Sequence, residues 1–274
     1  MTAAAALLAS VAWGVADFLG GLKSRTIHVL VVLLLAQISG VLAIGLVVAL
    51  AGNAPPASVL WAALAGLFGA IGLASFYRGM AVGAISVVAP IAAVGAIVPV
   101  VFGIATGDDI SRLQGFGFAL ALSGVALASF ERHEAGAVRL AAGVPWALAA
   151  VVGFGGYYVP MHEASGEDFL WAALVFRTTV ALLALTAWLV VRPPLGAARG
   201  HLGAIMLIGI LDTAGNTLFA AASSQGEVSV VSVLATLYPV TTVALAALVL
   251  GERLDRLQLV GVASAVSGVV LISS

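Results

Sequence analysis

Cysteine is absent from this chain of 274 residues, and charged residues are scarce. Without cysteine there are no disulfides, thiolate metal sites or cysteine nucleophiles. Asp, Glu, Lys and Arg together make up 8% of the residues, whereas about a quarter is usual in a soluble domain. So few charged side chains cannot cover a surface that faces water, and the composition therefore excludes a water-soluble fold.

Signals for nucleic-acid binding and for catalysis are missing as well. The formal net charge is −1, so no basic field attracts nucleic acid. The sequence holds no HExxH motif and no recurring pair of acidic residues. His162 and Glu163 form one neighbouring pair, which is more typical of an interfacial contact than of a metal site. We therefore expect no nucleic-acid partner, no metal, no cofactor and no enzymatic activity.

Apolar residues are what the chain has in abundance: they make up 62% of it, and the mean hydropathy is +1.20. A membrane-spanning helix needs about 20 mainly apolar residues. The first such run has no Lys or Arg before it, so we interpret it as a retained helix and not as a signal peptide. Ten segments are predicted in all: 3–21, 29–51, 59–77, 84–106, 113–130, 141–160, 169–191, 201–222, 228–250 and 257–273. The fold class is an all-α membrane protein, placed in the plasma or inner membrane and surrounded by its lipid bilayer.

The two halves of the chain resemble each other. A shift of 143 positions aligns residues 64–88 with residues 207–231 without a gap and with eight identical pairs. Residues 13–24 likewise lie over residues 154–165. The longest charged break, residues 131–139, separates the halves. We therefore predict two five-helix repeats, formed by residues 1–135 and 136–274.

Five spans is an odd number, so the second repeat enters the membrane from the opposite side. Inverted repeats are the design of many secondary transporters, whose substrate site lies near the midplane between the halves. The positive-inside rule places both termini outside the cell, because Arg112 alone among the loop cations lies on their side. The other side carries nine: Lys23, Arg25, Arg78, Arg132, Arg139, Arg192, Arg199, Arg253 and Arg256.

Ionisable residues inside a span are costly and are therefore candidates for function. Asp212 and Asn216 are four residues apart and share one face of a helix. They suit a coupling-ion or substrate-amine site, or else Asp212 pairs with a neighbouring helix to fix packing. Asp17 either faces a cavity, lies in the headgroup zone or pairs with Lys23. Asp212 and Asp17 are the two candidates for binding a proton or another coupling ion.

Arg177 and three aromatic residues are further candidates for binding a substrate, together with Asn216. The planar guanidinium of Arg177 could hold a substrate carboxylate, or it could extend to the membrane interface. Trp13, Tyr157 and Tyr158 could form the flat walls of a pocket. The alternative for the aromatic residues is an interfacial belt.

Three prolines lie inside predicted spans. Pro90 and Pro99 belong to segment 84–106, and Pro239 belongs to segment 228–250. Each removes one backbone hydrogen bond and favours a kink. Because the two segments are repeat partners, paired bends could gate the two ends of a cavity.

The pattern resembles the EamA branch of the drug/metabolite transporter superfamily. The resemblance rests on the two repeats, on Trp13-Gly14, on Pro239 and on the junction Gly251, Glu252, Leu254, Gln258 and Gly261. It implies a ten-helix bundle with a central cavity and alternating access without a nucleotide. It also implies cytoplasmic termini, which disagrees with the charge count. Members of the family often carry an Arg at the position of Arg177, and Gln37 occupies the corresponding position in the first repeat.

Two functions follow as expectations. The first is a secondary transporter of small metabolites, such as amino-acid-like or drug-like solutes. Export and coupling to protons are part of this expectation, and the transporter would act as a monomer or a homodimer. The alternative is a non-transporting membrane sensor or partner subunit with the same fold. The sensor would have a tightly packed interior, whereas the transporter needs a cavity that one side can reach.

Overall fold

The computed structural model describes residues 2–56, 59–106, 111–128, 130–132, 138–226, 228–252 and 256–272. The long apolar segments are helical, because a helix satisfies its interior backbone N–H and C=O groups by itself, which lipid cannot do. Within these ranges, eight helical segments have the length and the hydropathy to cross a membrane. The chain is a multi-pass helical membrane protein.

The helices follow the predicted segments closely. The first half contains α1 (Thr2–Ser24), α2 (Val29–Ala51), α3 (Val59–Val82), α4 (Ile85–Ala93), η1 (Val94–Ala96), α5 (Ile97–Thr106) and α6 (Arg112–Ala128). The second half contains α7 (Val144–Ser165), α8 (Phe169–Val191), η2 (Gly196–His201), α9 (Leu202–Ser223), α10 (Val228–Ala235), α11 (Tyr238–Leu245), η3 (Ala246–Leu250) and α12 (Arg256–Ile272). The predicted segments 113–130 and 257–273 coincide with α6 and α12, which have 17 residues each.

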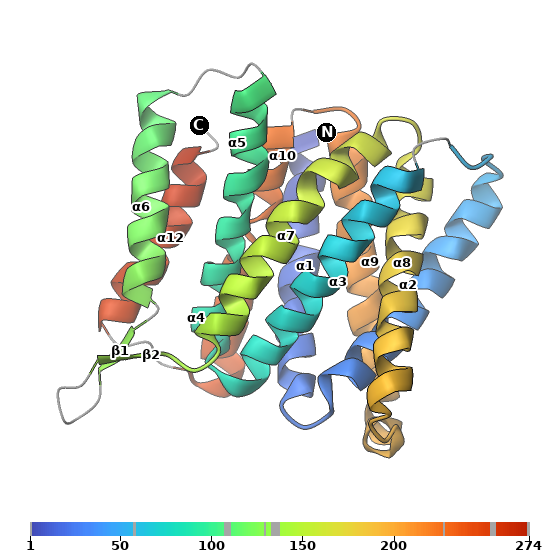
Figure 1. Ribbon diagram of the computed structural model, residues 1–274, viewed down its shortest axis with the longest axis horizontal. Coiled ribbons are helices and arrows are strands. Elements are labelled where there is room, and N and C mark those ends of the chain that lie inside the picture. The colour runs from blue at the N-terminus through green and yellow to red at the C-terminus, as the bar shows by residue number, and fades with distance from the viewer. Residues whose placement is uncertain are drawn as a thin grey trace.

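Four helices form the centre of the bundle, and a helix pair lies at each edge (Figure 1). In the centre, α1 packs along α9 and α3 packs along α7. The pair of α6 and α12 lies at one edge and the pair of α2 and α8 at the other. The labels N and C lie at the same upper edge in Figure 1. Each central helix therefore comes from a different part of the chain, and the space between them is shared by both halves.

Polarity is distributed as lipid requires, with apolar side chains outside and polar ones inside. Leu50 and Leu248 expose 79% and 82% of their surface. In contrast, Asp17, Arg177 and Asp212 are all buried. Lipid tails solvate the outer leucines well, whereas a charged group in their place would be unfavourable by several kcal/mol, ~3 on insertion scales.

Glycines allow the central helices to approach one another closely. A β-carbon on Gly153 of α7 would collide with the backbone of Gly72 on α3, and one on Gly209 of α9 would collide with the carbonyl of Ala36 on α2. Small residues at such contacts are typical of helix packing in membranes. Close backbone contact therefore replaces the hydrophobic driving force that lipid does not provide.

Two spans are interrupted, and the prolines explain where. The 3-10 turn η1 divides α4 from α5 just before Pro99, while α10 ends just before Pro239, which lies in the first turn of α11. Proline has no N–H to donate to the carbonyl four residues earlier, which loosens the preceding turn. Pro90, in contrast, lies inside α4 without a break. A bend at Pro90 was expected, and the helix continues through it.

A short β-ribbon joins the halves, although no strand was expected. β1 (Phe130–Arg132) pairs antiparallel with β2 (Val138–Leu140), and Glu131 lies opposite Arg139. Three residues a strand are too few to show the alternation by which strands are recognised in a sequence. The predicted boundary between residues 135 and 136 lies outside the described residues.

Candidate functional site

A cavity lies at the centre of the bundle, between α1, α3, α7, α8, α9 and α11. Its volume of about 40 Å³ has room for a few water molecules. A metabolite needs more space than this, so it would fit only if the walls moved apart. Its walls are formed by Trp13, Asp17, Gly69, Leu73, Phe154, Tyr157, Tyr158, Phe176, Asp212, Asn216 and Tyr238.

The cavity brings together most of the side chains that the sequence singled out. Asp17 lies one turn after Trp13 on α1, and Asn216 lies one turn after Asp212 on α9. Residues four apart share a helix face, so each helix presents its pair to the same space. Tyr157 and Tyr158 reach that space from α7. The exception is Arg177, which is not part of the wall.

Arg177 is fully buried and forms an ion pair with Asp212. Its Nη1 lies 2.6 Å from Asp212 Oδ2 and donates a second hydrogen bond of 2.7 Å to Gln37 Oε1. Extension of Arg177 to the interface, one of the two readings of the sequence, is therefore wrong. Nε and Nη2 of Arg177 have no hydrogen-bond partner among the described residues. Asp212 thus pairs with a neighbouring helix, as the packing alternative expected, and it also lines the cavity.

A hydrogen-bond network extends from this ion pair to α7. Asn216 Nδ2 donates to the carbonyl of Asp212 at 2.7 Å and to its Oδ1 at 3.3 Å. The Tyr157 hydroxyl donates to Asn216 Oδ1 at 2.8 Å. The neighbouring Tyr158 hydroxyl shares a hydrogen bond of 2.9 Å with Thr236 Oγ1. The polar groups of Asp212, Asn216, Tyr157 and Tyr158 thus already have protein partners.

Asp17 is different, because it has no such partner. It is only 5% exposed, and among the described residues no hydrogen bond or ion pair to its carboxylate occurs. The predicted alternative of a pairing with Lys23 is wrong. Lys23 Nζ instead lies 3.4 Å from His201 Nδ1. The carboxylate of Asp17 therefore faces the cavity without a countercharge.

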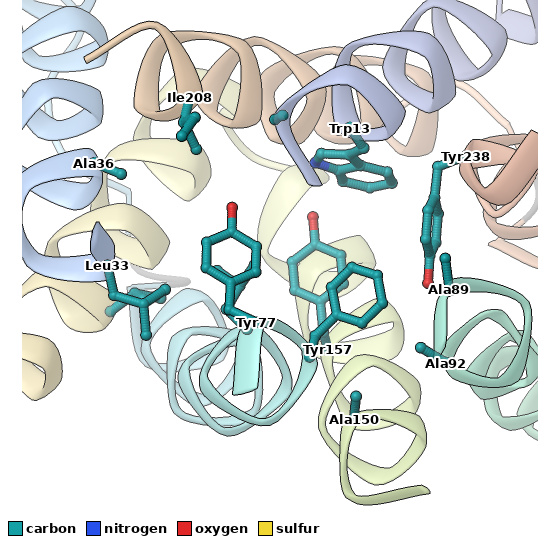
Figure 2. Close-up of a cluster of buried hydrophobic side chains, with 14 of the residues drawn as sticks. Trp13, Leu33, Ala36, Tyr77, Ala89, Ala92, Ala150, Tyr157, Ile208 and Tyr238 are labelled. Carbon is teal, nitrogen blue, oxygen red and sulfur yellow. The ribbon is translucent and has the colours of Figure 1, made fainter. Parts of the chain in front are cut away.

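Aromatic rings form much of the remaining wall (Figure 2). The rings of Trp13 and Tyr157 meet edge to face with centroids 6.2 Å apart, and those of Tyr157 and Phe176 are 5.1 Å apart. In Figure 2, the Tyr157 hydroxyl points from α7 towards the side of α1 and α9, and Tyr238 lies beside Trp13. Edge-to-face contacts are a preferred arrangement of aromatic rings, so the rings of the wall support one another's positions.

Sequence reasoning missed five wall residues, which are Gly69, Leu73 and the aromatic residues Phe154, Phe176 and Tyr238. The repeat alignment could have found Phe154, since it is the counterpart of Trp13. Phe176 precedes Arg177 and Tyr238 precedes Pro239, but neither position in the sequence marks a cavity wall. Their roles depend on how helices from different parts of the chain meet.

A second polar cluster closes the cation-rich end of the bundle. Arg25 Nη2 lies 2.7 Å from Glu252 Oε1 and donates to the Gly83 carbonyl. Glu252 Oε2 accepts from the backbone N–H and the hydroxyl of Ser86 at 3.0 and 2.8 Å. The carboxylate thus caps the first turn of α4. Burial acts to raise the pKa of Glu252, but the hydrogen bonds from Ser86, Arg25 and the Ile85 N–H outweigh it and lower that pKa below its usual value.

No part of the described chain gathers three or more His, Asp or Glu side chains that could hold a metal ion. His162 and Glu163 lie at a polar hollow near the ends of α7 and α9, which Ser223, Ser224 and Gln225 also line. The hollow is separate from the central cavity. The side chains that the central cavity itself presents are carboxylates, hydroxyls, an amide and aromatic rings.

Comparisons with known proteins agree with this architecture. Residues 141–274 match the EamA-like transporter family. A solved structure, described only as the crystal structure of a protein, has the same fold, with a TM-score of 0.67 over 98% of this chain and 96% of that one. At 20% identity that likeness concerns the fold alone. Among curated proteins no match is found.

Proposed function

Because this chain belongs to the EamA-type members of the drug/metabolite transporter superfamily, we propose that it is a secondary transporter of a small metabolite. In this proposal two inverted five-helix repeats expose the central cavity alternately to the two sides of the membrane. The observation that carries it is the central cavity itself, which both halves line. A sensor or partner subunit with a fully packed interior would not need it.

The wall residues come in repeat-related pairs, which supports the inverted repeat. With the shift of 143, Gly69 corresponds to Asp212 and Leu73 to Asn216. All four line the cavity. With the shift of 141 that places residues 13–24 over residues 154–165, Trp13 corresponds to Phe154 and Asp17 to Tyr158, and these four line it too. A cavity lined by both members of four pairs is expected on the twofold axis that relates two inverted repeats.

Helix packing supports the same symmetry. The packing of α1 on α9 has a counterpart in the packing of α7 on α3, because α7 and α3 are the repeat partners of α1 and α9. The pairs of α2 with α8 and of α6 with α12 join each helix to its own partner. Arg177 even contacts Gln37, the residue that takes its place in the first repeat.

Two features support alternating access. The spans that contain Pro99 and Pro239 are interrupted at related places, and helices bend most easily at such breaks. The contacts of Arg25 and Glu252 join the α1–α2 loop, α4 and the residues just after η3 at one end of the bundle. Opening that end would require these contacts to break.

For ion coupling we propose Asp17 as the proton-binding group, with Asp212 second. Asp17 faces the cavity unpaired, whereas Asp212 is neutralised by Arg177. Trp13, Tyr157, Tyr158 and Asn216 would contact the substrate. Arg177 would act through Asp212 and not by contact with the substrate, because it is outside the cavity wall.

The test uses the full chain in liposomes with a pH gradient. Labelled amino acids, sugars, nucleosides and amines are supplied one at a time, and accumulation is measured against protein-free vesicles. We expect accumulation of at least one class, and at least a tenfold loss of gradient-driven transport in Asp17→Asn. Glu163→Gln is the matched control, because Glu163 is exposed and outside the cavity, and it should behave as wild type.

Two outcomes would contradict this. If no class accumulates in either direction, the chain is not a transporter of these solutes. If a class accumulates and Asp17→Asn still follows the pH gradient, Asp17 is not the coupling group. In that case Asp212→Asn is the next variant to measure.

A further inference from the structure

The two sides of the central cavity differ in chemistry. The side of α1 and α9 contributes Asp17, Asp212 and Asn216, whereas the repeat-related positions on α7 and α3 hold Tyr158, Gly69 and Leu73. One wall is therefore acidic and the opposite wall is apolar and aromatic. A substrate that fits both walls has a positive group at one end and a flat apolar body at the other.

The charges around the cavity do not balance. Asp17, Asp212 and Arg177 are the charged side chains buried in the described spans. Arg177 is 2.6 Å from Asp212 and neutralises it, which leaves Asp17 alone. An unpaired buried carboxylate is strongly unfavourable unless it takes up a proton or receives a cation. The cavity thus has one vacant position for a positive charge.

For a substrate carboxylate, the cavity wall offers no partner comparable to the one that Asp17 offers to a cation. The guanidinium of Arg177 is not part of the wall, and its Nη1 is used by Asp212 and Gln37. The Tyr157 hydroxyl and the amide of Asn216 donate to protein acceptors. The hydroxyl of Tyr238 has no partner among the described residues, but one neutral donor cannot offset repulsion from the unpaired carboxylate of Asp17.

The aromatic wall suits the apolar body and also favours a cation. Six of the wall residues carry an aromatic ring: Trp13, Phe154, Tyr157, Tyr158, Phe176 and Tyr238. Ring faces attract ammonium groups, most strongly where water is excluded. Trp13 lies one turn before Asp17 on the same helix, so an ammonium group at Asp17 would lie near its ring.

The geometry points to a substrate that is a small aromatic monoamine without a carboxylate, with its ammonium group on Asp17 and its ring between the aromatic side chains. This inference rests on the proposed function and narrows it to one chemical class. It also predicts that the site distinguishes an amine from the amino acid with the same ring, since these two molecules differ only by the carboxylate.

The experiment compares matched pairs on the wild-type chain purified in detergent. Phenethylamine is compared with phenylalanine, and tryptamine with tryptophan, by thermal stabilisation and by competition for binding of the labelled amine. We expect each amine to bind at least tenfold more tightly than its amino acid. Asp17→Asn should lose at least tenfold in amine affinity, Asp17→Glu should retain more of it, and Glu163→Gln should not change it.

The outcomes separate this inference from transport itself. If the amino acids bind as well as the amines, or if no amine binds, the inference is overturned, even where vesicles accumulate another solute. If amines bind through Asp17 but no vesicle accumulates any solute, the ligand class stands and the transport proposal fails. If Asp17→Asn does not fold, the wild-type comparison of each matched pair still decides.

Discussion

At the scale of single residues, the interior is organised by one buried ion pair. Arg177 and Asp212 come from helices that are 35 positions apart in the sequence, and Gln37 joins them from 140 positions away. A buried charge is tolerated where its partner and its hydrogen bonds are in place. The ion pair with Arg177, which lies outside the cavity wall, stabilises Asp212 in its position at the cavity.

Removal of one partner of the ion pair should therefore destabilise the fold far more than removal of both partners. We expect Arg177→Leu to lower the free energy of unfolding by about 3–5 kcal/mol, because Asp212 is left buried without a countercharge. The double variant Arg177→Leu with Asp212→Leu should recover a large part of that loss. Thermal unfolding in detergent measures both. A single variant as stable as the wild type would show that Asp212 is not charged in the native state.

At the scale of elements, one polar cluster holds the ends of two helices. The last turn of α3 and the first turn of α4 leave carbonyl and N–H groups without helical partners. Arg25 donates to the Met80 and Gly83 carbonyls, and Glu252 accepts from the N–H groups of Ile85 and Ser86. One ion pair thereby satisfies two helix ends.

The lowered pKa of Glu252 makes this contact sensitive to acid. A carboxylate whose pKa is lower in the folded chain stabilises it fully above the unfolded pKa of about 4. That stability is lost as the pH falls through the lower folded value. We expect Glu252→Gln to unfold at a lower temperature than wild type at pH 7, with the difference shrinking below about pH 4.

Thermal unfolding of the wild type and of Glu252→Gln from pH 7 to pH 3 provides the measurement. Other carboxylates titrate in the same range, so the difference between the two proteins carries the information. Glu163→Gln serves as the control, since Glu163 is exposed. A difference between wild type and Glu252→Gln that stays constant with pH would argue against the ion pair.

The same scale shows where helix prediction succeeds. Spans were predicted within a few residues of α1, α2 and α8, because hydropathy is a local property that acts over about 20 residues. The helix breaks before Pro99 and Pro239 were predictable, because proline lacks the N–H that the helix needs. The unbroken helix at Pro90 was not predictable, since the neighbouring helices decide whether a proline bends a span.

At the scale of the whole molecule, charge is concentrated at one end. The last turn of α1 carries Lys23 and the loop after it carries Arg25, while Arg192 and Arg199 follow α8. These ends of α1 and α8 lie at the edge opposite the N and C labels in Figure 1. Loops rich in Lys and Arg stay on the cytoplasmic side of membranes. This favours termini outside the cell, against the cytoplasmic termini that the family resemblance implies.

Tags at both termini and a tag inserted at Gly200 test the orientation. Gly200 lies in the exposed turn η2, where added atoms meet no neighbour. In intact cells we expect protease to remove both terminal tags and to spare the tag at Gly200. The reverse pattern would show the flipped orientation. Cleavage of a single terminal tag would contradict an even number of spans, and with it the inverted repeat.

The sequence by itself determined the membrane class, the positions of most helices and the short list of ionisable residues inside them. These depend on local composition, because lipid selects each segment of about 20 residues on its own hydropathy. Only the tertiary structure decided which of those residues are paired. Arg177 neutralises Asp212, Glu252 caps α4, and Asp17 faces the cavity alone. The physical reason is that a charge in a low-dielectric interior is stabilised by whatever lies within a few ångströms, and those neighbours come from distant parts of the chain.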